Sequence, residues 1–393
     1  MKKYYFVIFF ICLFSNISSA DFKKIKKNAT ITNPKIIFPI RPNKGKCSEP
    51  VYHSFVSIYN PIETLDAPKG YGLDDRFDAV RSQFENYSIP CSGGDAESCK
   101  IVKKIILKWA KADAPKRLKK GDLWNDTLTI NLHINNPMMS AYSFARQVIK
   151  FSPDEEIIIE EWFKRIVKRG EHLMYGEKYG NNTGARGVPK SAHNHALSSA
   201  IAHMQLGVIL NDNKLFRKAF KNYEHAIRYQ RKNGSLPIEV RRGGRAMFYQ
   251  GRAMNALTVI AIIAENQGYN IWDYDHKSKG KNFHNLVKFF IDFTENNEIV
   301  FKYAKEMKAP GPAKDYKNQD LKIRRSSNWG WFYSYATRFP NHKNVKRIEN
   351  WVNNPENLNK YQMGFVHHYN NIGKRTFGDA SWTVVEANCH FLY

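Results

Sequence analysis

The feature that most constrains the fold is a run of apolar stripes at helical spacing in the part of the chain after Cys99. Val102, Ile105, Ile106 and Trp109 fall on one face of a helix with 3.6 residues per turn. Further helical stretches are expected at residues 141–150, 153–175, 195–210, 213–230, 245–267, 282–296, 298–307, 328–338 and 345–353. No strong alternation of the kind that strands show follows Cys99. The chain is therefore predicted to be all-α.

The predicted helices follow one another in pairs with short connections. Pro137, Pro153, Pro237 and Pro340 lie at or near the breaks, where proline is tolerated. Helical hairpins in series must bury their apolar stripes against each other. This arrangement predicts an α/α toroid, an incomplete barrel of helical hairpins, whose central cleft would accept an extended polymer.

The first twenty residues have the pattern of an export signal. Lys2 and Lys3 give a positive start, residues 4–14 are apolar, and Ser18-Ser19-Ala20 supplies small residues for cleavage. No later segment offers about 20 uninterrupted apolar residues, so no membrane span is expected. The protein is predicted to be periplasmic or secreted.

The chain is therefore predicted to have three regions: a signal peptide at 1–20, an N-terminal region at 21–98, and the helical toroid domain at 99–393. Residues 21–90 are rich in Pro, Asn, Lys and Gly and lack long helical periodicity. We expect this region to be irregular, with extended segments and loops that pack on the toroid.

Four cysteines remain after the signal: Cys47, Cys91, Cys99 and Cys389. Three pairings are open in an exported chain, and Cys91 with Cys99 is preferred because the Cys91-Ser-Gly-Gly segment favours a closed loop. Free buried thiols are the alternative. No Cys/His spacing resembles a zinc site, and neither a metal nor a cofactor is expected.

The formal net charge is +25, which calls for an anionic partner. Nucleic acid is a common partner of so basic a chain, but the predicted export argues against it. An acidic polysaccharide would also be attracted to a basic cleft. The alternative is that most lysines occupy solvated faces without a ligand. We expect the protein to be a monomer.

Four residues combine an amide, an imidazole, a guanidinium and a phenol: Asn194, His195, Arg242 and Tyr249. Arg242 and Tyr249 are seven residues apart, about two helical turns, so a helix would place them on one face. Taken singly, His195 and Tyr249 could be ordinary core residues. Together the four suit the removal of the proton beside a sugar carboxylate and the expulsion of the glycosidic oxygen.

This β-elimination needs a neutralised carboxylate, a base and an acid. Arg242 and Asn194 are the expected carboxylate clamp, because a guanidinium fork binds both oxygens and an amide binds one. The unperturbed pKa of a histidine is close to neutral, which suits His195 to proton transfer, and cations beside Tyr249 would favour the ionised form of the phenol. Two schemes stay open: His195 as base with Tyr249 as acid, or Tyr249 in both roles.

These residues resemble the alginate lyase family of periplasmic mannuronate lyases. That family has an Asn-His pair at the start of one helix and an Arg-Gly-x-Arg-Ala-x-x-Tyr block later, matched here by Asn194-His195 and Arg242-Gly-Gly-Arg-Ala-Met-Phe-Tyr249. The similarity runs from about Trp109 to Asp273. The resemblance implies an α/α toroid, catalytic His195 and Tyr249, and carboxylate neutralisation by Asn194 and Arg242.

The resemblance also implies a lid loop rich in Tyr, Lys and Arg, for which Lys69, Tyr71 and Arg76 are candidates. Further substrate-binding candidates are Arg245, which could instead hold the turn, and the aromatic and basic side chains of Trp329 and Arg375. Mannuronate, guluronate and glucuronate polymers remain open as substrates.

Two rival functions remain. An α/α-toroid hydrolase would use two carboxylates as acid and base, for which Glu239, Glu265 and Asp113 are the candidates. A non-catalytic polyanion-binding protein would rely on the basic surface alone.

Overall fold

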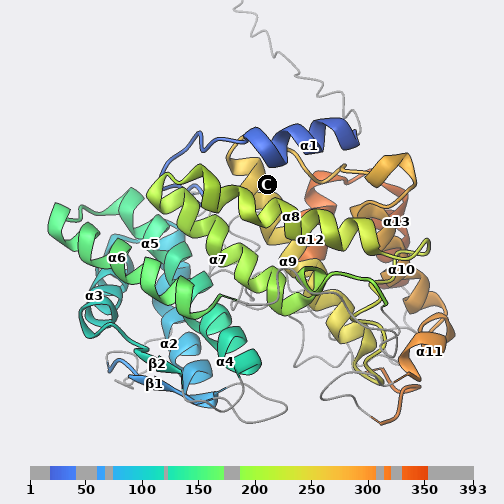
Figure 1. The fold of residues 1–393 in the computed structure, drawn as a ribbon, viewed down its shortest axis with the longest axis horizontal. Coiled ribbons are helices and arrows are strands. Elements are labelled where there is room, and N and C mark those ends of the chain that lie inside the picture. Colours follow the sequence, from blue (N-terminus) through green and yellow to red (C-terminus); the bar gives the residue numbers. More distant parts are fainter. Residues whose placement is uncertain are drawn as a thin grey trace, which may run out of the picture.

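The computed structural model describes residues 18–40, 60–66, 74–118, 123–171, 186–306, 314–319 and 330–352, and these are mostly helical (Figure 1). The α-helices are α1 (Ser19–Asn28), α2 (Asp75–Ser92), α3 (Ala96–Ala112), α4 (Leu123–Ile130), α5 (Asn136–Val148), α6 (Pro153–Arg169), α7 (Asn194–Leu210), α8 (Asn213–Tyr229), α9 (Ala246–Asn266), α10 (Phe283–Glu295), α11 (Glu298–Ala304), α12 (Gly330–Arg338) and α13 (Lys343–Val352). Shorter elements are the π-helix η2 (Asn131–Asn135), the 3-10 helices η4 (Lys190–Ala192) and η5 (His276–Ser278), and the strands β1 (Thr64–Leu65) and β2 (Arg117–Leu118). The two strands pair in parallel, Thr64 opposite Arg117.

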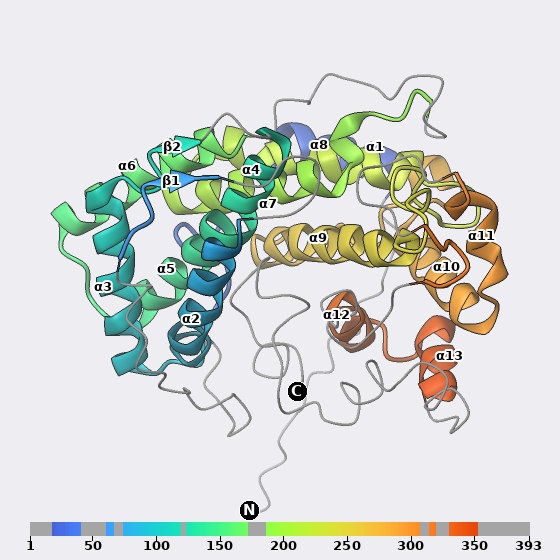
Figure 2. The same ribbon diagram turned by 90° about the horizontal axis from the view of Figure 1, so that it is seen from below.

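The described helices form an arch (Figure 2), with α2 and α3 at one end and α10 and α13 at the other. Helix α7 contacts α5, α6, α8 and α9, and α9 in turn contacts α10 and α12. In Figure 2, α8 lies on the outer side of α7 and α9 on the inner side. The protein is thus all-α, an incomplete toroid of packed helices, as the sequence predicts.

Helices α7 and α9 are buried on every side. All residues of α7 from Asn194 to Ile209 are buried, and so are nearly all of α9 from Ala246 to Ala264. Both helices therefore lie in the interior of the protein, with polar as well as apolar side chains enclosed. The N-terminal ends of both helices carry the candidate residues, so the scaffold of the site is also the core of the fold.

A tight turn joins α7 to α8. Asn211 ends α7 in the left-handed region at φ 55°, and the Asp212 side chain accepts hydrogen bonds from the first backbone amides of α8. Gly207 allows the two helices to approach closely, because a Cβ there would lie 2.4 Å from the backbone nitrogen of Phe216. The sequence Asn211-Asp212 therefore fixes this hairpin locally.

The expectation of extended segments and loops over residues 21–90 is wrong at two places. Helix α1 buries Phe22, whose ring stacks on Tyr274 with centroids 3.9 Å apart. Helix α2 has a stripe at helical spacing, Phe77, Val80 and Phe84, and all three are buried. Pro90 and the polar residues around this stripe made the helical periodicity of α2 hard to recognise in the sequence.

Cys91 and Cys99 form a disulfide, which confirms the preferred pairing. Cys91 is in the last turn of α2 and Cys99 in the first turn of α3, so the loop that the bond closes contains the turn at Gly93 and Gly94 and joins two helix ends. The predicted boundary between residues 98 and 99 falls inside α3. Cys47 and Cys389 lie outside the described residues.

Residues 1–17 of the predicted signal also lie outside the described residues, while Ser18 caps α1 and Ser19 begins it. Among the helices of the described ranges, none is long and apolar enough to cross a membrane.

Candidate functional site

The first two candidate residues lie in the first turn of α7. The 3-10 helix η4 ends just before His193, whose Nδ1 accepts a hydrogen bond of 3.2 Å from the backbone amide of His195 and so caps α7. The rings of His193 and His195 contact each other edge to face, with centroids 4.7 Å apart. Asn194 is fully buried and His195 is 5% exposed. The helix start thus holds both side chains in fixed places.

A buried carboxylate connects α7 to the second block of candidates. Glu239 accepts two hydrogen bonds from Asn194, one from its backbone amide at 2.9 Å and one from its Nδ2 at 3.0 Å. The Nη1 atom of Arg242 lies 3.8 Å from Glu239 Oε2. Burial raises the pKa of the Glu239 carboxyl, while Arg242 and the bonds from Asn194 oppose that rise. Glu239 therefore orients both members of the predicted carboxylate clamp.

Arg242 and Tyr249 are in direct contact. The guanidinium carbon of Arg242 lies 3.3 Å from the centre of the Tyr249 ring, and the two side chains are 4% and 5% exposed. A guanidinium over an aromatic face is a favourable arrangement. It also places a positive charge beside the phenol, which stabilises a phenolate there.

The prediction that a shared helix face would place Arg242 beside Tyr249 is wrong. Arg242 is not on the helix with Tyr249, because α9 begins at Ala246 and Arg242 lies on the preceding bend. Gly243 adopts φ 58°, a left-handed conformation that suits glycine, and Arg245 donates a backbone hydrogen bond of 3.1 Å to Arg242. A turn, rather than a shared helix face, brings the guanidinium over the ring.

The other predicted binding residues have different positions. Arg245 is the partly buried N-cap residue of α9, next to the candidate cluster. Arg76 lies in the first turn of α2, where it donates to Asp74 at 2.6 and 2.9 Å and to the carbonyl of Thr64 at 2.9 Å. These bonds attach the start of α2 to β1. Lys69, Tyr71, Trp329 and Arg375 lie outside the described residues.

The three carboxylates that a hydrolase would need are separated. Asp113 ends α3 and bonds Arg165 and Arg169. Glu265 pairs with Arg338 near the C-terminal end of α9, sixteen residues or about 24 Å along the helix from Tyr249. Only Glu239 belongs to the candidate cluster, whereas paired catalytic carboxylates lie about 5–9.5 Å apart. The arrangement does not form an acid and base pair.

The sequence did not predict that Glu239 would belong to this site. In the sequence analysis Glu239 is only a candidate carboxylate of the rival hydrolase. The signal that could have found it is a charged residue between Ile238 and Val240 in an apolar segment directly before the Arg242 block. Within the described ranges, no group of three His, Cys, Asp or Glu side chains is placed to hold a metal ion.

The fold is that of the α/α toroids, and the amide, imidazole, guanidinium and phenol gather at the N-terminal ends of its two enclosed helices. A model of the alginate lyase family matches residues 98–301, just over half of the chain. The chain belongs to the alginate lyase family.

Individual relatives agree with this assignment. An alginate lyase of Pseudomonas syringae pv. tomato is 26% identical over 187 residues, and one of Pseudomonas fluorescens is 24% identical over 259 residues. The matched stretches cover 45% and 60% of those relatives and 45% and 63% of this chain. The chain thus spans about half of the length of the first of these relatives.

Solved structures show the same fold. The crystal structure of alginate lyase A1-III from Sphingomonas species A1 matches with a TM-score of 0.54 and 20% identity. A tyrosine-to-phenylalanine variant of alginate lyase A1-III complexed with tetrasaccharide matches with a TM-score of 0.57 and 19% identity. Each match covers 83% of this chain and 88% of the other.

Proposed function

We propose that this protein is an exported polysaccharide lyase that cleaves a linear polyuronate by β-elimination and leaves a 4,5-unsaturated non-reducing end. Alginate, and its mannuronate stretches in particular, is the proposed substrate, and glucuronan or another uronate polymer is the alternative. The observation that carries the proposal is the continuous buried series of contacts from Asn194 through Glu239 and Arg242 to Tyr249.

The first requirement of this reaction is to neutralise the substrate carboxylate. Removing the C5 proton places a second negative charge beside that carboxylate, so donors aimed at it lower the barrier. The guanidinium of Arg242 supplies a positive charge in a buried setting, and the amide of Asn194 supplies a further donor. Burial strengthens both interactions, because little water screens them.

The second requirement is a pair of proton transfers. A base takes the proton from C5, the electrons of that bond form the C4–C5 double bond, and the C4–O bond breaks while an acid protonates the departing oxygen. In one scheme His195 is the base and Tyr249 the acid, and in the other Tyr249 acts in both roles in a syn elimination. The contact between Arg242 and the Tyr249 ring supports a phenolate at this position. In the first scheme the phenolate forms when Tyr249 gives up its proton, and in the second it is present before the reaction.

The family assignment supports the proposal. The relatives of Pseudomonas syringae pv. tomato and Pseudomonas fluorescens are named alginate lyases. Two of the structures with the same fold are a tyrosine-to-phenylalanine and a histidine-to-alanine variant of alginate lyase A1-III, each complexed with tetrasaccharide. A tyrosine and a histidine are also the residue types to which we assign the proton transfers.

The predicted signal at residues 1–20 supports export, and we propose that the mature protein acts as a monomer on a carboxylated polymer. N-terminal sequencing of the protein recovered from a periplasmic fraction would test the export, with a new N-terminus near Asp21 as the expected result.

One assay tests the activity. Purified protein is incubated with polymannuronate, polyguluronate and glucuronan, and the ultraviolet absorbance of the unsaturated product is followed. We expect the absorbance to rise fastest with polymannuronate. Release of saturated ends without this absorbance would support a hydrolase instead. Binding without turnover of any polymer would support a polyanion-binding protein.

A further inference from the structure

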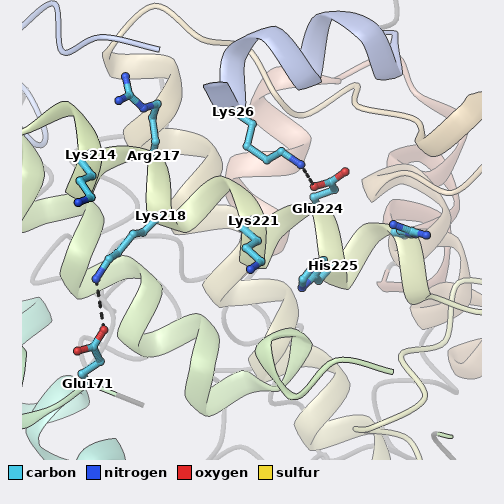
Figure 3. A pocket seen from close by; sticks show the side chains of 9 residues that line it. Lys26, Glu171, Lys214, Arg217, Lys218, Lys221, Glu224 and His225 are labelled. Carbon is cyan, nitrogen blue, oxygen red and sulfur yellow. Dashed lines mark hydrogen bonds and ion pairs between the residues drawn. The ribbon is translucent and has the colours of Figure 1, made fainter. Parts of the chain in front are cut away.

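A basic groove lies on the surface of α8, beside α1 (Figure 3). We call it the α8 groove; it has a volume of about 710 Å³, and it also contains His225 and two glutamates. Its cationic side chains come from α1 and α8 and are Lys26, Lys214, Arg217, Lys218, Lys221 and Arg228. Six cations face two carboxylates, so the lining is strongly positive.

The shape of the α8 groove follows from the two faces of α8. One face packs Phe216, Phe220 and Tyr223 into the core, which leaves the basic residues on the opposite face. From Lys214 to Arg228 this basic row is about 21 Å long, at 1.5 Å per residue. Lys26 reaches the row from α1 (Figure 3). The groove is thus long enough for several units of an extended chain.

The two carboxylates of the α8 groove are already engaged. Glu224 pairs with Lys26, and Glu171 lies 3.3 Å from the Lys218 ammonium and 3.4 Å from Nε2 of His203. The hydrogen bond with His203 lowers the pKa of Glu171 to about 2. Within the described ranges, Lys214, Lys221 and Arg228 have no carboxylate partner. Three cations in a concave surface are therefore available to an external anion.

The α8 groove is close to the candidate active site but separate from it. Nδ1 of His225 lies 2.6 Å from the Ser191 hydroxyl, and Asn222 donates a hydrogen bond of 2.9 Å to the Ser191 carbonyl. Ser191 precedes Asn194 by three residues, at most about 11 Å of extended chain. One short segment thus separates the inner wall of the groove from the predicted carboxylate clamp.

We propose that the α8 groove is a second binding site for an acidic polysaccharide. It binds one segment of a polysaccharide molecule while another segment of the same molecule occupies the active site. A linear row of cations matches a polymer that carries one carboxylate on each sugar, whereas a compact anion would use only part of the row. The identity of the polymer rests on the proposed function. Binding at this site retains a long chain between cleavage events, so it affects long substrates and leaves short ones unchanged.

The test compares two triple variants in a background that carries Tyr249→Phe to suppress cleavage. One combines Lys214→Gln, Lys221→Gln and Arg228→Gln in the α8 groove. The matched control combines Lys104→Gln, Lys108→Gln and Lys111→Gln on α3, where a smaller basic pocket of about 420 Å³ lies. Both remove three positive charges from an outer helix. Affinity for a polymannuronate of about twenty units and for its trimer is measured by calorimetry at two salt concentrations.

We expect the α8 variant to bind the long polymer about tenfold more weakly, the sum of three exposed charge contacts, with a shallower salt dependence. We expect the α3 variant to bind it as the parent does, and the trimer to bind equally to all three proteins. Equal affinity of the α8 variant and the parent for the long polymer would overturn the proposal. An equal loss in the α3 variant would also overturn it, because general charge would then explain the binding.

Turnover of the same groove variant made with Tyr249 intact distinguishes this proposal from the proposed function. Groove-dependent binding together with no turnover by the protein with Tyr249 intact would support the second site and refute the lyase activity. With Tyr249 intact, equal turnover of long chains with and without the three α8 groove substitutions would support the activity and refute the second site.

Discussion

Replacing Glu239 gives the sharpest test of the site, because this carboxylate is fully buried, accepts hydrogen bonds from Asn194 and lies 3.8 Å from the guanidinium of Arg242. In Glu239→Gln the shape is retained, but one acceptor oxygen becomes an amide that cannot accept. One of the two hydrogen bonds from Asn194 is then lost in a buried setting, which costs about 1–3 kcal/mol. Glu239→Ala removes both bonds and the carboxylate beside the buried Arg242, so its cost rises to about 3–5 kcal/mol.

The effect on turnover follows from the loss of position. Without Glu239, neither Asn194 nor Arg242 keeps its present orientation, and a shift of about 1 Å in a substrate-positioning group lowers the rate about 100-fold. We expect Glu239→Gln to lower kcat by about 10- to 100-fold. Urea unfolding gives the free energy of unfolding, and the ultraviolet assay gives kcat on polymannuronate.

Glu265→Gln is the matched control. Glu265 also pairs with an arginine, Arg338, but at the other end of α9. Its side chain is 36% exposed, so we expect a loss of at most about 1 kcal/mol of stability and an unchanged kcat. If Glu239→Gln kept the kcat and the stability of the unsubstituted protein, the positioning role of Glu239 would be refuted. An equal loss of kcat in both variants would show that stability, rather than position, controls turnover.

Four further outcomes are expected. Tyr249→Phe lowers kcat at least about 100-fold in the ultraviolet assay, because the phenol is an acid in both schemes. Near-normal turnover would exclude the scheme in which Tyr249 is both acid and base, and it would weaken the scheme in which His195 is the base. Arg242→Lys lowers kcat/KM about 10- to 100-fold, since an ammonium cannot bind both carboxylate oxygens, and a value equal to that of the unsubstituted protein would contradict the clamp. Replacing Cys91 and Cys99 together by serine lowers the free energy of unfolding by about 2.5 kcal/mol in urea, from the entropy of a loop of eight residues, with kcat retained. Burial lowers the pKa of His225 to about 4, so the native ring stays neutral where the unfolded ring, with a pKa near 6.5, takes up a proton. The unfolding free energy therefore falls as the pH is lowered from about 6.5 to about 4, and His225→Gln should make the measured curve flatter in that range.

Much of the helical architecture could be predicted from apolar spacing. The stretches predicted at 195–210 and 213–230 match α7 and α8 to within one residue, because Asn211 and Asp212 give clear end and start signals. The stretch predicted at 153–175 ends too late, since α6 ends at Arg169 and Gly170 follows it. Helix α4 and the π-helix η2, residues 123–135, were missed, because their mixture of polar and apolar residues gives no single stripe.

The sequence named the candidate residues of the site, but the contacts that join them could not be predicted from it. A spacing of seven residues suggested that Arg242 and Tyr249 were neighbours, and they are, but through a turn at Gly243 that helical periodicity cannot reveal. The contact of Glu239 with Asn194 joins residues 45 positions apart in the chain. That contact forms because the loop before α9 packs against the start of α7, so no local pattern in the sequence identifies Asn194 as the partner of Glu239.

The enclosure of α7 and α9 has a consequence for how this protein can change over time. Side chains at the start of these helices pack in the same interior that stabilises the fold. A substitution that changes the chemistry of the site therefore also lowers the free energy of unfolding. The exposed faces of the outer helices are under no such constraint. We therefore expect differences in substrate choice among relatives to accumulate in their surface residues, while the innermost pair of helices stays nearly unaltered.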